Sequence, residues 1–202
     1  MSIKSKNITR VVSLVPPEDR WSRQGHQGGV FWFTGLPGSG KATLALNMER
    51  RLFDEGYQVR AFRSSDFRDG VSSDLRFSRD DRREHIRRLG EVAALLARRG
   101  MVVLTAFISP FQADRDNARE AAAGTFHEIY LDPGLKVCEE RDLKGIYAKA
   151  RAGEIDEFTG ISSPYEPPEA SELTIDTGAV TVGESLDMLD DYISRAVRLP
   201  AA

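Results

Sequence analysis

The sequence lacks the features that mark a secreted, membrane-spanning or broadly basic protein. Only one of its 202 residues, Cys138, is a cysteine, so an internal disulfide is excluded and a reducing compartment is expected. No apolar run is long enough to span a bilayer, and residues 1–29 show no signal-peptide pattern. The formal net charge is -3, so no global basic field favours nucleic acid or an anionic membrane. We therefore expect a cytoplasmic protein that binds neither.

Short apolar runs alternate with stretches of helical periodicity along most of the chain. The expected strands are residues 29–35, 57–62, 101–107, 126–132 and 173–177. Ser78 is expected to cap a long helix that ends near Gly100, and residues 183–197 are expected to form the last helix. This alternation predicts an α/β protein with a parallel five-stranded sheet flanked by helices, whose ligands bind at the carboxyl ends of the strands.

The chain length and its 41% of hydrophobic residues favour one domain with a sizeable core. We expect residues 28–199 to form this domain and residues 1–27 to form a loosely packed arm. Between residues 141 and 169 the chain is polar and rich in glycine and proline, a composition typical of a mobile lid.

Residues 33–46, FTGLPGSGKATLAL, contain a phosphate-binding loop with one altered position. Gly35, Gly40 and Lys41 complete the pattern Gly-x-x-x-x-Gly-Lys between an expected strand and an expected helix. Such a loop directs backbone N–H groups, the positive end of the helix and the lysine charge at one phosphate group. The hydroxyl residue that usually follows the lysine and binds magnesium is Ala42 here. Thr43 does not replace it, because one helical residue rotates a side chain by about 100°.

The loop makes ATP the expected ligand and a P-loop NTPase fold the expected class. The expected nucleotide-binding residues are Gly35, Leu36, Pro37, Gly38, Ser39, Gly40, Lys41, Ala42 and Thr43.

Five motifs, in order along the chain, resemble those of the adenylylsulfate kinases. They are FWFTGLPGSGK, FSRDDRREHIRRLGEVA, VVLTAFISPFQADRDNAR, VCEERDLKGIYAKARAGEI and EFTGISSPYEPPE. The resemblance runs from about Gly25 to the last helix. It implies phosphorylation of adenosine 5′-phosphosulfate at its 3′-hydroxyl in sulfate activation, with ATP and Mg²⁺ as cofactors and a homodimeric assembly. Association with ATP sulfurylase is a further expectation.

The resemblance also assigns roles to individual positions. The substrate-binding residues are expected to be Arg68, Phe77, Arg82, His85, Ile108, Ser109, Pro110, Lys144 and Phe158. Arginine forks suit phosphate and sulfate oxygens, and aromatic rings suit adenine stacking. Arg141 and Arg151 match lid residues that touch ATP phosphates. The catalytic set is Lys41, Ser65, Asp66 and Ser109.

Four of these positions have a second interpretation. Ser109 stands where the family has been assigned a phosphoserine intermediate, and alternatively it is a turn serine that caps the next helix. Arg141 and Arg151 either meet the ATP phosphates or are solvated helix charges. His85 either hydrogen-bonds the nucleotide or is structural.

The departures from the family pattern gather where the chemistry is expected. The family has Asp-Gly-Asp-Asn after the second strand, whereas this chain has Arg63, Ser64, Ser65 and Asp66. A serine is no general base at neutral pH, and an arginine beside the metal would repel Mg²⁺. Further replacements are Arg76 for Gly, His85 for Asn and Ser162 for Asp.

Three hypotheses therefore remain open on the sequence. The first is an adenylylsulfate kinase in which Asp66 or Asp69 supplies the carboxylate, because phosphoryl transfer depends chiefly on positioning and charge. The second is a catalytically degenerate module that binds ATP or adenylylsulfate as a regulatory or partner subunit. The third is a P-loop kinase for another acceptor.

All three hypotheses share the prediction that ATP or ADP binds at the loop. Lys41→Ala should weaken ADP binding strongly in a calorimetric titration, because the loop loses its one point charge toward the phosphates. A protein without the substitution that binds no nucleotide would contradict the functional assignment of the loop.

Overall fold

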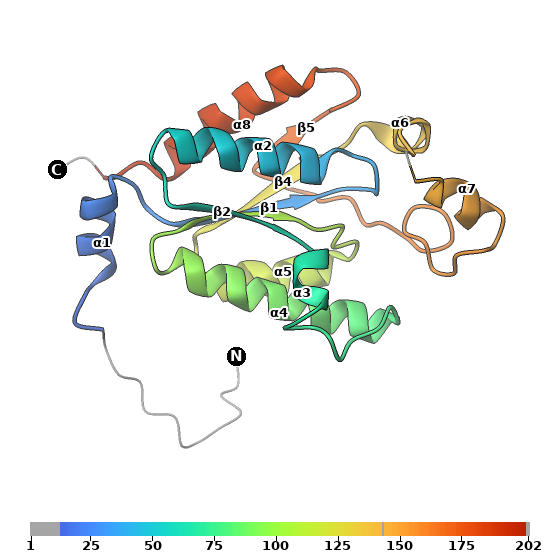
Figure 1. The fold of residues 1–202 in the computed structure, drawn as a ribbon, viewed down its shortest axis with the longest axis horizontal. Coiled ribbons are helices and arrows are strands. Elements are labelled where there is room, and N and C mark those ends of the chain that lie inside the picture. Colours follow the sequence, from blue (N-terminus) through green and yellow to red (C-terminus); the bar gives the residue numbers. More distant parts are fainter. Residues whose placement is uncertain (1–12, 143, 201–202) are drawn as a thin grey trace.

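The computed structural model describes residues 13–142 and 144–200. In this part of the chain a parallel sheet with strand order β2-β3-β1-β4-β5 lies between two layers of helices (Figure 1). The strands are β1 (Gly29–Thr34), β2 (Val59–Arg63), β3 (Val102–Ala106), β4 (Phe126–Leu131) and β5 (Leu173–Ile175). The helices are α1 (Pro17–Gln24), α2 (Lys41–Asp54), α3 (Ser65–Arg68), α4 (Arg79–Ala97), α5 (Gln112–Ala122), α6 (Gly134–Glu140), α7 (Ile146–Arg151) and α8 (Val182–Ala196).

The central strand β1 is buried on both faces, which explains its continuous apolar sequence. Phe31 and Phe33 belong to one cluster, with the apolar sides of α2 and α8. Val30 and Trp32 face the opposite way, into a second cluster with α4 and α5. Because successive strand residues point to opposite faces, these four side chains fix β1 in the middle of two hydrophobic cores.

The position of β1 also determines where ligands can bind. It pairs with β3 on one side and β4 on the other, so the chain leaves β1 where the strand order changes direction. Ligands of open parallel sheets bind at such a point, outside the carboxyl ends of the strands. The predicted phosphate-binding loop joins β1 to α2 at this place (Figure 1).

The predicted strands and helices are present, with shifts of up to three residues at their ends. Ser78 caps α4 as expected, since its hydroxyl accepts a hydrogen bond from the Asp81 amide at 3.2 Å. Thr181 and Glu184 form a reciprocal capping box at the start of α8. The sequence analysis gave no bounds for α1, α3, α5, α6 or α7.

The structure describes residues 13–27 of the expected arm, and residues 1–12 lie outside the described part. Helix α1 has no buried residue, which agrees with loose packing. His26 is buried instead, and its Nε2 accepts a hydrogen bond from the Gln58 amide at 3.0 Å. The Gln27 amide donates to the Val197 carbonyl, so the chain joins the main body before residue 28. The division of the chain into an arm and a domain stays a prediction.

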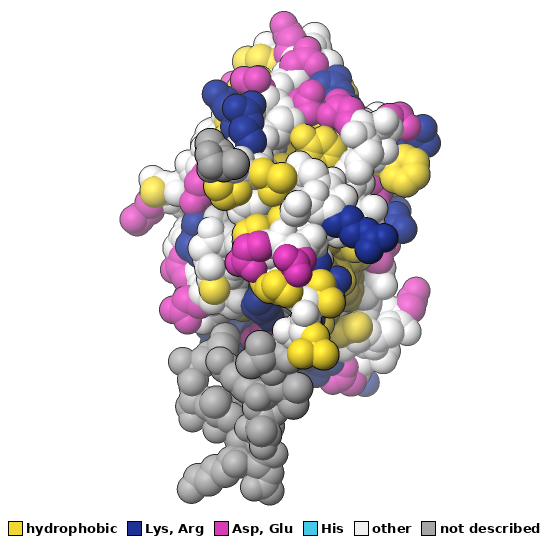
Figure 2. Space-filling model, turned by 90° about the vertical axis from the view of Figure 1, so that its left-hand side faces the viewer, with side chains coloured by type: hydrophobic (Ala, Val, Ile, Leu, Met, Phe, Trp, Pro, Cys, Tyr) yellow, Lys and Arg dark blue, Asp and Glu magenta, His cyan; other side chains and the backbone are white. Residues whose placement is uncertain are grey.

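The surface agrees with the small net charge. Figure 2 shows the end of the molecule that carries α1, where basic, acidic and hydrophobic side chains are interspersed. In the part of the chain that the structure describes, no helix is both long enough and apolar enough to cross a bilayer.

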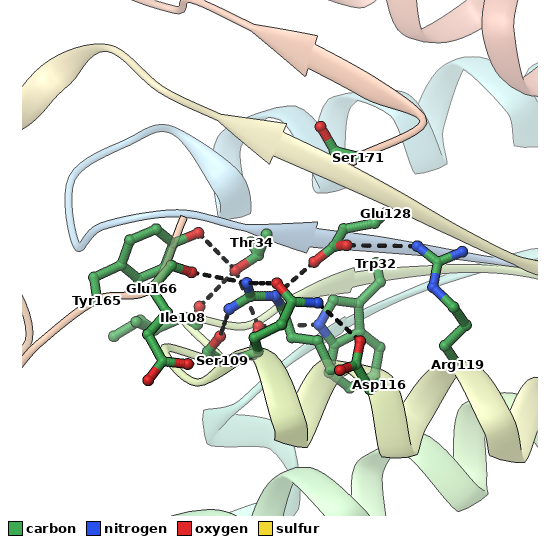
Figure 3. Close-up of polar contacts among 12 residues, drawn as sticks. Trp32, Thr34, Ile108, Ser109, Asp116, Arg119, Glu128, Tyr165, Glu166 and Ser171 are labelled. Atoms are coloured by element: carbon green, nitrogen blue, oxygen red, sulfur yellow. Dashed lines mark hydrogen bonds and ion pairs between the residues drawn. The ribbon is translucent and has the colours of Figure 1, made fainter. Parts of the chain in front are cut away.

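A buried ion pair between Arg115 and Glu128 joins α5 to the sheet, and Figure 3 labels Glu128. Arg115 and Glu128 are 1% and 3% exposed, and the Arg115 Nε lies 2.6 Å from Glu128 Oε1. The Arg115 guanidinium also donates to the carbonyls of Ser109 at 2.8 Å and Glu166 at 2.7 Å. These contacts fix the turn after β3 and the end of the 141–169 segment against the same side chain.

We expect Glu128→Gln to lower the free energy of unfolding by about 3–5 kcal/mol, because the Arg115 charge would remain buried without its counter-ion. Urea denaturation measures this change. Asp54→Asn is the control, since Asp54 forms an exposed pair with Arg50 and its loss should cost less than about 1 kcal/mol. Equal effects of the two substitutions would contradict the importance of the buried pair.

Candidate nucleotide-binding site

The loop between β1 and α2 has the backbone shape that a phosphate group requires. Gly35 has φ +144° and Gly38 has φ +82°, values that side-chain-bearing residues rarely adopt. A Cβ atom would lie 2.5 Å from the Leu131 carbonyl at Gly35 and 2.8 Å from the Cys138 carbonyl at Gly38. The first turn of α2 has no side-chain cap and no acidic residue, so its N–H groups are available to an anion.

Lys41 lies inside this loop, 8% exposed. Its Nζ donates to the carbonyls of Gly35 at 2.8 Å and Leu36 at 2.7 Å, and to the Ser39 hydroxyl at 3.2 Å. Burial lowers the pKa of Lys41 to about 7. A phosphate group in the loop would favour the charged form, so anion binding and protonation of Lys41 reinforce each other.

A cavity of about 720 Å³ opens above the loop. Its walls come from the loop, α2, the end of β3, the lid and the start of α8. The lining residues are Pro37, Gly38, Gly40, Lys41, Ala42, Thr43, Leu44, Ala106, Ile108, Arg141, Thr177, Val180, Thr181, Val182 and Ser185. This volume lies within the range of pockets that hold small molecules.

The segment from Thr177 to Ser185 is the part of the cavity wall that the sequence analysis missed. The Thr177 hydroxyl donates to the Ser39 carbonyl at 2.9 Å and accepts a hydrogen bond from Arg141 at 3.1 Å. Thr177 thus connects the loop to the lid. The signal was available, because the predicted fifth strand ends at this residue, on the same side of the sheet as the loop.

The two lid arginines differ in position. Arg141 lines the cavity, where the predicted contact with ATP phosphates is possible. Arg151 does not line it and pairs with Glu139 at 2.5 Å, as a solvated helix charge does. The predicted role of Arg151 in ATP binding therefore has no support in this geometry.

The chain offers few side chains to a magnesium ion. Position 42 carries only a methyl group, and Asp66 is already paired with a cation. Among the described residues, no group of three or more His, Cys, Asp or Glu is placed to hold a metal ion. The residues present therefore do not fit a magnesium ion held by protein ligands.

The altered segment after β2 is closed by an ion pair. Arg63 Nη2 lies 2.8 Å from Asp66 Oδ1, and the Arg63 amide donates to the same carboxylate at 2.9 Å. These bonds outweigh partial burial and keep the pKa of Asp66 below its usual range. Asp66, one of the predicted catalytic residues, is thus an ionised carboxylate already held by Arg63. Ser65, another, is exposed, with its hydroxyl 3.5 Å from Asp66 Oδ1.

Two of the departures from the family pattern contact each other. The Ser64 hydroxyl lies 2.8 Å from His85 Nε2 and joins the segment after β2 to α4. His85 is 2% exposed, and burial, with the nearby charges of Arg68 and Arg88, lowers its pKa to about 4. The structural interpretation of His85 fits this position better than a contact with the nucleotide.

Arg68 and Phe77 form the first part of the predicted acceptor site. The Arg68 guanidinium lies 4.3 Å from the centre of the Phe77 ring and donates to the Arg76 carbonyl at 2.8 Å. Phe77 is 65% exposed, so its ring can still stack against a ligand. Arg68 covers one face of the ring.

Arg82 connects the Phe77 segment to the segment that contains the second aromatic residue, Phe158. Its guanidinium donates to the Phe77 carbonyl at 2.8 Å and to the Glu157 carbonyl at 2.9 Å, next to Phe158. The sequence places these aromatic residues 81 positions apart (158 − 77). A cavity of about 240 Å³ beside Arg82 is lined by Arg79, Arg82, Phe111, Glu157, Ser162, Ser163, Pro164 and Glu166.

Ser109 is held inside the protein. Its hydroxyl accepts a hydrogen bond from Trp32 Nε1 at 3.0 Å and donates to the Thr34 hydroxyl at 3.1 Å (Figure 3). It is 1% exposed and has φ +40°, an uncommon value away from glycine. The helix-capping interpretation is wrong, since α5 begins after Phe111 without a side-chain cap. The phosphoserine interpretation gains no support from a buried hydroxyl whose hydrogen is already donated.

The remaining predicted residues lie on both sides of this network. Ile108 lines the large cavity, and its carbonyl accepts a hydrogen bond from the Thr34 hydroxyl at 2.8 Å. The Pro110 carbonyl accepts one from the Glu166 amide at 2.8 Å. Lys144 is exposed on the lid. The lid itself touches the loop, because the Tyr147 hydroxyl donates to the Pro37 carbonyl at 2.8 Å.

The parallel sheet, the glycine-rich loop at its centre and the buried lysine define a P-loop nucleotide-binding protein of the kinase type. The family model for adenylylsulphate kinase matches residues 27–176. The chain belongs to the adenylylsulfate kinase family.

Curated relatives and solved structures agree with this assignment. The chain is 49% identical over 187 residues to the adenylyl-sulfate kinase of Bacillus pumilus, covering 92% of this chain and 95% of the relative. It is 50% identical over 179 residues to that of Acaryochloris marina, covering 88% and 87%. The structure of the Mycobacterium tuberculosis APS kinase in complex with AMPPNP and APS matches with a TM-score of 0.79 and 42% identity, covering 83% of this chain and 98% of that one.

His85 generates a prediction on the pH dependence of stability. Its pKa in the folded state, about 4, lies below the value of about 6.5 in an unfolded chain, so protons favour unfolding as the pH falls through this window. Lowering the pH from 7 to 5 should therefore reduce the free energy of unfolding by about 2 kcal/mol through His85. Urea denaturation at both pH values should show that His85→Asn loses less stability on acidification than the unsubstituted protein. Identical pH dependence in the two proteins would contradict the buried, neutral imidazole.

Proposed function

We propose that this chain transfers the γ-phosphoryl group of ATP to the 3′-hydroxyl of adenosine 5′-phosphosulfate, giving 3′-phosphoadenylylsulfate. The observation that carries the proposal is the bridge made by Arg82, which joins the backbone carbonyl of Phe77 to that of Glu157, the residue before Phe158. The lid that carries Phe158 also touches the phosphate-binding loop. The proposed acceptor site therefore lies next to the donor site at the phosphate-binding loop.

In the proposed reaction the 3′-hydroxyl oxygen forms a bond to the γ-phosphorus and releases its proton to solvent, the bond from that phosphorus to the bridging oxygen breaks, and ADP leaves. Such transfer depends mainly on alignment and on charge around the phosphoryl group. Lys41, the first turn of α2 and Arg141 supply positive charge on the donor side. Phe77 and Phe158 hold the acceptor base, with Arg68 and Arg82 beside them.

ATP is the proposed donor, and Mg²⁺ is proposed to arrive on its phosphates rather than on protein ligands. Mg²⁺ keeps several waters and is commonly bound through one or two carboxylates and the substrate phosphates. Ala42 has no hydroxyl, and Asp66 is paired with Arg63. These residues therefore favour a Mg²⁺ ion that enters the site bound to the ATP phosphates.

A second candidate function is binding without turnover. The observation that favours it is again the Arg63–Asp66 pair, which engages the one carboxylate of the altered segment. In this case the chain would hold ATP or adenylylsulfate as a regulatory or partner subunit.

One experiment separates these functions. ADP formation is measured with ATP and adenylylsulfate in a coupled assay, and adenylylsulfate binding is measured by calorimetry on the same preparation. Turnover supports the kinase, and binding without turnover supports the second candidate. A protein that shows neither turnover nor adenylylsulfate binding would contradict the kinase and a module that binds adenylylsulfate, and would direct attention to a kinase for another acceptor.

The assembly and location are part of the same proposal. We propose a homodimer in the cytoplasm, and association with ATP sulfurylase remains a prediction. A solved relative, the APS kinase of Thiobacillus denitrificans, is described as hexameric, matches with a TM-score of 0.63 at 27% identity, and is covered over 30% of its chain. Light scattering of the purified protein measures the oligomeric state directly.

The acceptor site generates a further prediction. Alanine at Arg68, Phe77 or Arg82 should weaken adenylylsulfate binding more than ATP binding, because these side chains form or hold the acceptor platform. Calorimetric titration with each ligand measures this difference. Phe53→Ala is the control, since Phe53 is an exposed ring of α2, 59% accessible, that lines neither cavity. Equal losses for the two ligands would show that the acceptor site is misplaced.

The altered donor and base positions generate the last prediction. Ala42→Ser restores a hydroxyl beside the phosphates, and Ser65→Asp restores a carboxylate after β2. Together they should raise turnover with adenylylsulfate more than either does alone, because each group contributes fully only beside the other. General acid–base assistance is typically about 10²–10⁴-fold, so steady-state assays will resolve the effect.

Arg63→Asp belongs in the same series, because the guanidinium would otherwise pair with a restored carboxylate. A protein that already turns over rapidly, and gains nothing from these substitutions, would show that the altered positions do not limit the chemistry.

A further inference from the structure

Tyr147 in α7 contacts both halves of the proposed site. Its hydroxyl donates to the Pro37 carbonyl of the phosphate-binding loop at 2.8 Å. Its ring meets the ring of Phe158 edge to face, with centroids 4.9 Å apart and an interplanar angle of 76°. The side chain is 3% exposed. No other contact among those described above joins the loop directly to a stacking residue of the acceptor site.

The Pro37 carbonyl needs such a partner. A phosphate-binding loop must turn its N–H groups toward the anion and its carbonyls away from it. Proline has no N–H, so its backbone contributes only the carbonyl. A buried carbonyl without a donor is destabilising, and the Tyr147 hydroxyl supplies that donor. The next residue, Gly38, packs so closely against α6 that a Cβ would lie 2.8 Å from the Cys138 carbonyl. The lid therefore holds the loop at position 37, and α6 packs against it at position 38.

The position of Tyr147 is itself fixed by the start of α7. The Asp142 carboxylate accepts hydrogen bonds from the amides of Ile146 at 2.9 Å and Tyr147 at 2.6 Å. On the other side, the Phe158 amide donates to the Ser162 hydroxyl at 2.9 Å. Both ends of the contact are thus anchored, and a shift of the loop at Pro37 reaches Phe158 through one side chain.

We propose that Tyr147 is a positioning residue that couples donor binding in the loop to acceptor binding at Phe158. The inference rests on the proposed function. Whichever nucleotide binds first shifts Pro37 or Phe158, and Tyr147 passes this shift to the other side, so the second nucleotide meets a site that is already biased toward its bound arrangement. The coupling is reciprocal, because each ligand must change the affinity of the other by the same factor.

Tyr147→Phe tests the proposal, since it removes the bond to Pro37 and keeps the ring that meets Phe158. Tyr192→Phe is the matched control, because the Tyr192 hydroxyl also makes one side-chain hydrogen bond, to His127 Nδ1 at 2.9 Å, and lines neither cavity. Calorimetry gives the dissociation constant of adenylylsulfate with and without saturating ADP, and of ADP with and without adenylylsulfate. Thermal unfolding is recorded for each variant.

In the unsubstituted protein and in Tyr192→Phe we expect ADP to tighten adenylylsulfate binding by at least about fivefold. In Tyr147→Phe this factor should fall to within about twofold of unity, while the affinity for adenylylsulfate alone changes little. Phe158→Leu breaks the same contact from its other end. Its double variant with Tyr147→Phe should lose no more coupling than either single variant, as expected for two parts of one connection.

Several outcomes would overturn the inference. Coupling that persists in Tyr147→Phe, or that disappears equally in Tyr192→Phe, would show that Tyr147 does not carry it. The same conclusion follows if ADP has no effect on adenylylsulfate binding to the unsubstituted protein. These results leave the proposed function intact. A protein that does not bind adenylylsulfate would instead contradict the proposed function, together with the inference that rests on it.

Discussion

Arg115 carries a full positive charge where almost no water reaches it, and the surrounding chain is arranged to satisfy that charge. Glu128 from β4 supplies the counter-ion, and the carbonyls of Ser109 and Glu166 and the Gln112 side chain accept hydrogen bonds from the guanidinium (Figure 3). Because a buried charge is tolerated only when fully paired, the turn after β3 and the end of the lid have little freedom to move independently. The left-handed backbone of Ser109 is held by this same contact.

The donor and acceptor sides of the site have changed to different degrees. The loop keeps its glycines, its lysine and an open helix start, which are the parts that bind phosphate whatever the later chemistry. The segment after β2 has instead exchanged its carboxylates for a self-contained arrangement. Arg63 neutralises Asp66, and Ser64 reaches His85. The contact between Ser64 and His85 joins two altered positions. The replacement after β2 and the replacement on α4 therefore form one interaction.

The sequence predicted part of the site, and it could not predict the contacts between residues that are far apart in the chain. The spacing of the motif predicted the roles of Lys41 and the loop glycines, because a short motif determines the conformation of its own backbone. Arg151 and Arg141 looked alike in the sequence, yet only Arg141 lines the cavity, since Thr177 holds it there. Ser109 was expected to react or to cap a helix; in this structure it caps no helix, and Trp32 and Thr34 engage its hydroxyl. Such contacts join residues about 75 positions apart, which periodicity does not reveal.

The sequence by itself determined the parallel α/β sheet, the phosphate-binding loop and the family, because apolar periodicity and closely spaced motifs depend on neighbouring residues. The tertiary structure decided which charges are paired and which side chains share a cavity. Arg115 of α5 pairs with Glu128 of β4, and Tyr147 reaches Pro37 across 110 positions. Hydrogen bonds and ion pairs have narrow distance and angle requirements, and only the packed sheet, helices and lid bring distant residues within them.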